Sequence, residues 1–216
     1  MRNILFCGYR DWSKKIYKSL GNEYKSVVNL IYVTEGDNLS EFVDRYNPDM
    51  IFFVGWSWII NKDIIDNNRC ICLHPSPLPK YRGGSPLQHQ IINGETESAV
   101  TLFEMDNGID TGDILYQSKF SLEGNLEVIF KRIVNWGIFG ISKIIDNSYT
   151  KVKQDENDAT FYKRRKPSMS EISIYDFEKL TAKEIHNKIR SLQDPYPNAY
   201  VVCKDGTKLF LKESKI

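Results

Sequence analysis

The sequence has few of the features that mark secreted, membrane-spanning or disulfide-rich proteins. Its four cysteines are too few and too irregularly spaced for a disulfide framework in a chain of 216 residues, so we expect reduced thiols. The longest apolar stretch, 50–60, contains a glycine and a serine and is too short to cross a bilayer. The N-terminus lacks the apolar segment of a signal peptide. We therefore expect a cytoplasmic protein with no membrane partner.

The chain also lacks an excess of charge of either sign. Its 29 basic and 28 acidic residues leave a net charge of +1, whereas nucleic-acid binders usually carry a clear basic excess. We therefore expect no nucleic-acid partner. Hydrophobic residues at 41% and charged residues at 26% are typical of a globular protein, and the length suits one main domain with a small addition.

Strand and helix patterns alternate over the first third of the chain. Strands are predicted at 3–8, 27–33, 50–54 and 69–73, and helices at 11–20, 40–46 (capped by Ser40) and 63–66. This alternation is typical of a Rossmann-like, doubly wound and mostly parallel α/β sheet covered by helices on both faces. Ligands of such sheets bind beyond the carboxyl ends of the strands, and His74 directly follows one of these ends.

The later part of the chain changes character near residue 150, where a polar stretch begins. Before it we predict strands at 99–104 and 114–120 and a long helix at 126–145; after it, a helix at 182–192 capped by Thr181 and a hairpin of 200–203 with 208–211. We interpret 1–160 as a catalytic domain and 161–216 as a short C-terminal subdomain that completes the acceptor site. The short hairpin would gain stability by packing against another surface, and a homodimer is one way to provide it.

Two loops carry a motif that resembles a known family. The first reads LHPSPLPKYRGG over 73–84, and the second reads MDNGIDTGD over 105–113. Together they are similar to the formyltransferases that use 10-formyltetrahydrofolate, which include methionyl-tRNA, glycinamide ribonucleotide and bacterial amino-sugar N-formyltransferases. The resemblance runs from 3 to about 165 and is strongest over 70–112. It implies the formyltransferase fold, with 10-formyltetrahydrofolate as the formyl donor and an amine as the acceptor.

His74 and Asp110 are the candidate catalytic residues within this motif. When an amine attacks a formyl carbon, negative charge builds on the formyl oxygen and the nitrogen must lose a proton. An imidazole can donate a hydrogen bond to that oxygen, and a nearby carboxylate can orient the imidazole and accept the proton. The alternatives are a structural loop histidine and a turn aspartate, with Asp106 and Asp113 as competitors in the same loop.

Cys72 is a departure from the family pattern. The family usually has an asparagine two residues before the histidine, where it donates a second hydrogen bond to the oxyanion. A thiol is a weak donor, and losing one oxyanion donor typically costs about 3 kcal/mol of transition-state stabilisation. Either another donor replaces it, which we favour, or the enzyme is slower or inactive. Cys70, Cys72 and His74 share one face of a strand, but no clustered fourth ligand accompanies them, so we expect no metal.

The resemblance also implies which segments contact the two substrates. For the folate we expect the loop backbone and apolar wall formed by Gly55, Trp56, Trp58, Ile59, Met105, Asp106, Gly108 and Ile109. For the acceptor we expect Ser76, Tyr81, Arg82, Gly83, Gly84, Gln88, Lys163, Arg164, Arg165 and Tyr196. The basic run at 163–166 is either a diphosphate site or a solvated face. Tyr196 either stacks on a nucleotide base or belongs to a rigid turn.

Several acceptors are compatible with the motif. We favour a UDP- or dTDP-linked 4-amino-4,6-dideoxy sugar of bacterial surface-glycan biosynthesis, because the RGG loop, the basic run and the segment DPYPNA occur together in a short chain. Methionyl-tRNA ranks lower, because the family member that uses it normally has a further β-barrel and a basic surface. A peptide-synthetase formylation unit, glycinamide ribonucleotide and a decayed protein that only binds folate or a nucleotide sugar are further alternatives.

Overall fold

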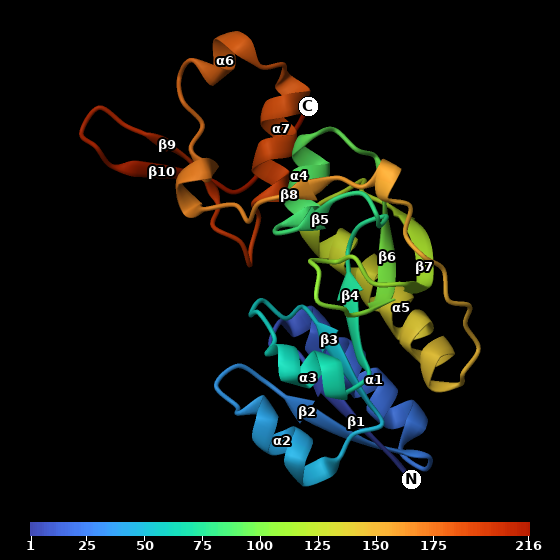
Figure 1. Ribbon diagram of the computed structural model, residues 1–216. Helices are drawn as coiled ribbons and strands as arrows, with labels where there is room; N and C mark the ends of the chain where they lie inside the picture. The colour runs from blue at the N-terminus through green and yellow to red at the C-terminus, as the bar shows by residue number, and fades with distance from the viewer.

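The computed structural model describes all 216 residues and is built around a six-stranded sheet (Figure 1). The sheet order is β2-β1-β3-β4-β6-β7. The strands β1 to β4 are parallel, whereas β6 and β7 join antiparallel. These strands are β1 (Arg2–Cys7), β2 (Val28–Val33), β3 (Met50–Val54), β4 (Cys70–His74), β6 (Glu97–Glu104) and β7 (Ile114–Ser121). The predicted mostly parallel α/β sheet is confirmed.

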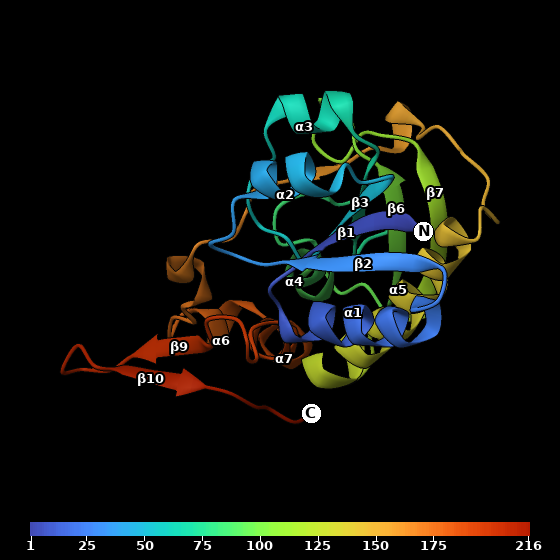
Figure 2. The same cartoon turned by 90° about the horizontal axis from the view of Figure 1, so that it is seen from below.

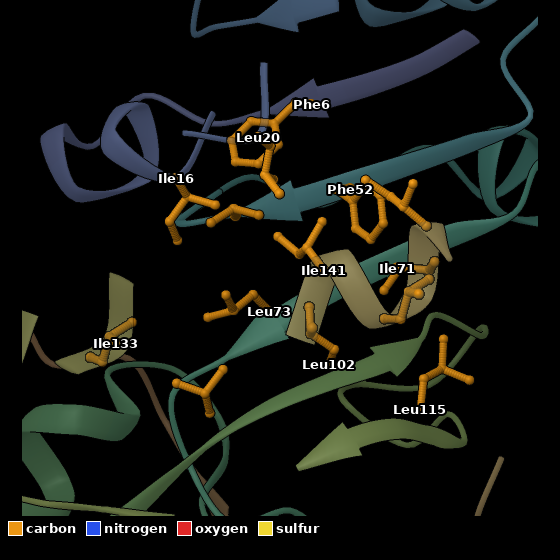
Figure 3. Close-up of a cluster of buried hydrophobic side chains, with 14 of the residues drawn as sticks. Phe6, Ile16, Leu20, Phe52, Ile71, Leu73, Leu102, Leu115, Ile133 and Ile141 are labelled. Carbon is orange, nitrogen blue, oxygen red and sulfur yellow. The ribbon is translucent and has the colours of Figure 1, made fainter. Parts of the chain in front are cut away.

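Helices cover both faces of the sheet, as Figure 2 shows. One face carries α1 (Asp11–Tyr24) and α5 (Leu126–Ile145), and the other carries α2 (Leu39–Tyr46) and α3 (Lys62–Asn67). Alternate strand residues therefore enter two separate cores. The larger core (Figure 3) includes Phe6, Ile16, Leu20, Phe52, Ile71, Leu73, Leu102, Leu115, Ile133 and Ile141. The smaller core, on the α2–α3 face, includes Leu5, Cys7, Ile51, Phe53, Ile64 and Cys70.

The chain after α5 forms a separate layer beside the sheet edge that bears the site. Its elements are η1 (Glu156–Asp158), β8 (Phe161–Tyr162), η2 (Pro167–Ser170), α6 (Asp176–Lys179), α7 (Ala182–Ser191), β9 (Ala199–Val202) and β10 (Lys208–Leu211). Helix α7 packs on α4 (Pro86–Ile92), and β8 pairs with β5 (Arg82–Gly83). The β9–β10 hairpin projects away from the sheet (Figure 1). None of the helices combines the length and the apolar character needed to span a membrane.

Most predicted elements are present, and the differences have local causes. The predicted capping of α7 by Thr181 is confirmed, with Glu184 completing the capping box. The predicted cap of α2 was wrong: Asn38 is the cap and accepts from the Ser40 N–H at 3.2 Å, because the helix already begins at Leu39. Helix α1 continues to Tyr24 rather than ending at residue 20, because Tyr24 extends its buried stripe by one more turn.

Candidate active site

His74 and Asp110 meet at the carboxyl edge of the sheet. His74 is the last residue of β4, and Asp110 lies in the loop between β6 and β7. The His74 Nδ1 and the Asp110 Oδ2 are 3.6 Å apart, and His74 is only 6% exposed. This separation is within ion-pair reach but longer than a hydrogen bond. The two residues that the motif singled out, far apart in the chain, therefore face each other in space.

The imidazole of His74 is oriented by its other nitrogen. Its Nε2 lies 2.8 Å from the carbonyl oxygen of Tyr81. A carbonyl only accepts hydrogen bonds, so Nε2 carries the proton and donates it to Tyr81. The nitrogen left for a ligand is therefore Nδ1, beside the Asp110 carboxylate.

Asp110 is held by its side chain and by its backbone. Its Oδ2 accepts a hydrogen bond from the Gly83 N–H at 2.7 Å. Its backbone φ of 55° lies in the left-handed region, which aspartate tolerates better than most residues. The Gln154 side-chain amide donates to the carbonyl oxygens of Asp110 at 2.9 Å and of Gly112 at 2.7 Å. These contacts hold the carboxylate at a defined place beside His74.

Arg82 supports this loop instead of facing a substrate. It is 5% exposed, and its guanidinium binds both carboxylate oxygens of Glu156 at 2.8 Å and the side-chain oxygen of Gln154 at 2.8 and 3.1 Å. The hydrogen bond from Arg82 lowers the pKa of Glu156. Four of the five guanidinium N–H groups are therefore used within the protein, and Arg82 holds the Glu156 and Gln154 side chains and does not reach toward the acceptor.

Ser76 and Tyr81 are likewise used within the protein. The Ser76 hydroxyl donates to the Lys80 carbonyl oxygen at 2.9 Å, and Ser76 is fully buried. The Tyr81 hydroxyl donates to Glu95 at 2.7 Å, and its ring stacks on Tyr162. Both side chains therefore stabilise the loop that carries His74 and do not face the acceptor side, contrary to the expectation from the sequence.

Cys72 faces the same side of the sheet as His74, against the smaller core. Burial and the nearby charge of Asp110 raise the pKa of the Cys72 thiol well above its ordinary value. A thiol that stays protonated is a poor nucleophile, so Cys72 retains only the role of a weak hydrogen-bond donor. Burial raises the pKa of Cys70 to about 12. The structure contains no group of three or more histidine, cysteine or acidic side chains placed to hold a metal ion.

The loops expected to contact folate flank this edge of the sheet. Trp56 and Met105, one from each loop, both pack against the smaller core. Beside them an apolar surface is exposed to solvent at Trp58, Ile59 and Ile109. The indole N–H of Trp56 is buried and has no hydrogen-bond partner. An open apolar wall with an unused donor suits a flat heterocycle with polar edges.

Each of these loops is held by contacts of its own. Asp106 ties its own loop, accepting from the Gly108 N–H at 2.9 Å and from the Thr111 hydroxyl at 2.6 Å. The other loop turns at Gly55, whose φ is 66°, and places Trp56 and Trp58 with ring centroids 4.9 Å apart.

The residues expected on the acceptor side come from three segments. The Gly84 N–H donates to the Tyr162 carbonyl at 2.8 Å, and the Arg165 N–H donates to the Ser85 hydroxyl at 3.1 Å. The basic run at 163–166 therefore lies directly against the loop that binds Asp110. Lys163 and Arg164 are exposed, whereas the Arg165 guanidinium donates to Met169 and is half-buried. Gln88, in α4, is buried, and the phenol of Tyr196 is its neighbour.

Two residues of this edge escaped the sequence analysis. Gln154, which holds the Asp110 loop, lies in a polar stretch that no pattern distinguishes. Arg10 lies in the turn after β1, beside the Gly55 loop. The position of Arg10 three residues after the end of a buried strand was the available signal, because the carboxyl ends of the parallel strands share one edge.

Comparisons with known proteins agree with this geometry. The Formyl transferase family model matches residues 29–127, and the model of the Formyl transferase C-terminal domain matches 169–216. A methionyl-tRNA formyltransferase of Finegoldia magna is 32% identical over 177 residues, which are 78% of this chain and 56% of the relative. The chain spans 56 to 64% of the length of such curated relatives.

Two solved structures extend the comparison. A methionyl-tRNA formyltransferase from Clostridium thermocellum has a TM-score of 0.85 and 32% identity, with 97% of each chain covered. WlaRD, a sugar 3-N-formyltransferase crystallised in the presence of dTDP and 5-N-formyl-THF, has a TM-score of 0.66 and 25% identity, with 88% of this chain and 79% of that chain covered. With its fold, its His74–Asp110 pair and a relative of this identity matched over nearly its whole length, the chain belongs to the formyl transferase family.

Proposed function

We propose that the protein transfers the formyl group of 10-formyltetrahydrofolate to a primary amine. The observation that carries this proposal is the His74 Nδ1 held 3.6 Å from the Asp110 carboxylate at the carboxyl edge of the sheet. Membership of the family supports the reaction, and the apolar wall beside Trp56 supports the folate.

His74 and Asp110 have different roles in the transfer. His74, protonated on Nδ1, donates a hydrogen bond to the formyl oxygen as it gains negative charge. Asp110 stabilises that imidazolium and accepts the proton that the attacking nitrogen loses, directly or through water. The acceptor gains a carbon–nitrogen bond to the formyl carbon. The carrier nitrogen, which loses its bond to that carbon, takes up a proton. The neutral Cys72 thiol adds a weak donor beside them.

The residues present fit the folate that this reaction requires. The exposed apolar side chains of Trp58, Ile59 and Ile109 offer a face for a flat ring, and the unpartnered Trp56 N–H offers a donor at its edge. We propose that these side chains hold the carrier. Bound there, it supplies the activated formyl group.

For the acceptor we propose a nucleotide-linked amino sugar. The basic run at 163–166 lies beside the loop that binds Asp110, and WlaRD is a sugar formyltransferase crystallised with dTDP. We also propose that residues 161–216 complete the acceptor site. Methionyl-tRNA is the second candidate, because the sequence relatives at 32 and 33% identity are methionyl-tRNA formyltransferases. The balanced charge of the chain gives less support to a nucleic acid.

A side-by-side comparison of acceptors tests this function. The protein is incubated with 10-formyltetrahydrofolate and, in separate reactions, with UDP- and dTDP-linked 4-amino and 3-amino sugars and with methionyl-tRNA. We expect mass spectrometry to show the mass gain of a formyl group on a sugar and tetrahydrofolate release in equal amount. Formylation of methionyl-tRNA alone would overturn the sugar assignment, and transfer to no amine under any condition would overturn the enzymatic one.

Replacement of Cys72 by asparagine tests the oxyanion position. We expect Cys72→Asn to raise kcat about tenfold, because an amide N–H is a stronger donor than a thiol. Cys72→Ala, which removes the donor, is the matched control and should lower kcat by a few-fold. Steady-state kinetics with circular dichroism separates activity from folding. A folded but inactive Cys72→Asn protein would show that the thiol has a role of its own.

A further inference from the structure

Arg10 is a cation without an acidic partner at the edge of the sheet that bears the site. It lies between β1 and α1, and its guanidinium forms neither an ion pair nor a side-chain hydrogen bond. It lies 4.6 Å from the centre of the Tyr9 ring. The adjacent Asp11 does not neutralise it, because that carboxylate is almost fully exposed and faces Lys14. A partly buried guanidinium with free donors is ready to receive an anion.

Two further polar groups lie beside Arg10. Gln88 is only 5% exposed, and its side-chain amide lies beside the phenol of Tyr196. The phenol of Tyr196 has Gln88, Arg10 and Tyr9 as its polar neighbours, and burial raises the pKa of Tyr196, so the phenol remains a neutral donor.

This cluster is held in place by packing. The Tyr196 ring packs on Phe130, and Phe130 stacks on Trp12, the second residue of α1. The Tyr9 hydroxyl is 2.7 Å from the Ser57 hydroxyl, which ties the β1–α1 turn to the loop after β3. The C-terminal segment is thereby fastened over the N-terminal sheet at Arg10.

The cluster also adjoins the His74–Asp110 pair. Arg10 follows β1, Gly55 follows β3 and His74 ends β4, so all three lie at one edge of the parallel sheet. A side chain added at Gly55 would lie 3.2 Å from the Arg10 side chain. Gln88 lies in the first turn of α4, shortly after Gly83, which binds Asp110.

We propose that Arg10, Gln88 and Tyr196 form a subsite for a phosphate group of the acceptor. This inference rests on the proposed function, because it assigns the acceptor that the His74–Asp110 pair formylates. The guanidinium supplies paired N–H donors and the charge, while the amide and the phenol supply neutral donors. A single partly buried cation suits a small phosphate ester or nucleoside diphosphate. A nucleic-acid backbone would require several cations along a surface.

Binding of nucleoside diphosphates tests the subsite independently of catalysis. Isothermal titration measures the Kd of UDP, dTDP and inorganic pyrophosphate for the wild type, Arg10→Met and Gln88→Leu. We expect Arg10→Met to raise the Kd at least thirtyfold and Gln88→Leu about tenfold, with the affinity for 5-formyltetrahydrofolate unchanged. Lys18→Met is the matched control, because Lys18 is an exposed cation of the adjoining helix α1, and it should leave every Kd unchanged.

Several outcomes overturn the subsite. It is wrong if the wild type binds none of the three phosphates, or if a folded Arg10→Met protein binds them as tightly as the wild type. It is also wrong if Arg10→Met weakens only the binding of a tRNA acceptor-stem duplex. Arg10→Lys distinguishes charge from packing and should recover part of the lost affinity. The proposed function fails separately, when the wild type transfers formyl to no amine while still binding nucleoside diphosphates.

Discussion

Asp110→Asn is expected to lower kcat for formyl transfer about a thousandfold while leaving the fold intact. The amide oxygen of asparagine can still accept from the Gly83 N–H, which binds Asp110 at 2.7 Å, so the loop should keep its shape. The amide has no charge to stabilise an imidazolium at His74 and cannot accept the proton of the attacking amine. Losing both contributions accounts for a fall of this size. Single-turnover kinetics measures the rate of formyl transfer, and thermal unfolding shows whether the fold is intact.

The same loop contains the control for this prediction. Asp113 lies three residues further on and faces Lys151 at 3.5 Å, away from the histidine. Asp113→Asn should therefore change kcat by less than a factor of two. His74→Ala should match the loss in Asp110→Asn, and the double variant should lose little more, because groups that act as one unit are not additive. Near-normal activity in a folded Asp110→Asn protein would remove this carboxylate from the mechanism.

The sheet and its major helices were accessible from the sequence because their patterns are local. The run Met50–Val54 is apolar throughout and is bounded by Asp49 and Gly55, and β3 has those bounds. The long helix was predicted at 126–145, where α5 lies, because its apolar positions repeat at helical spacing. Burial on both faces makes such patterns strong, and neither depends on distant residues.

The pairing of distant segments was not accessible in this way. The strands β5 and β8 have two residues each, too few to show any alternation, and they pair only because the two segments meet in space. The direction of β6 was equally hidden, because an apolar strand reads the same whether it joins parallel or antiparallel. Which strands pair depends on how the whole chain folds, whereas secondary-structure propensity and hydrophobic periodicity are properties of a few neighbouring residues.

The sequence singled out the two side chains that meet at the edge of the sheet, but not the residues that hold them there. The two loop motifs pointed to His74 and Asp110 because they resemble the motifs of the formyltransferases. They did not reveal that Arg82 is committed to Glu156 and Gln154, because an arginine in a glycine loop looks the same whether it is free or paired. Arg10 was overlooked because the sequence does not show whether an arginine has an acidic partner, and only the structure shows that Arg10 has none.

Gly84→Ala is expected to damage both stability and turnover, because it separates the segments that enclose the acceptor side. A methyl group on Gly84 would lie 2.5 Å from the backbone nitrogen of Arg164 and in overlap with its Cα. Neither atom belongs to a flexible side chain, so the backbone must move. We expect a loss of about 2 to 3 kcal/mol in the free energy of unfolding, or about 8 °C in Tm.

The activity of the same variant should fall further than its stability implies. The displaced strand carries Gly83, whose N–H holds the Asp110 carboxylate, and a misplacement of about 1 Å in such a site typically costs about a hundredfold in kcat. Gly21→Ala is the matched control: it lies in α1 with nothing near its added methyl group, and it should stabilise the protein by about 0.5 to 1 kcal/mol without changing kcat. A Gly84→Ala protein with normal Tm and kcat would show that the contact between this loop and residues 161–164 is not needed to position Asp110.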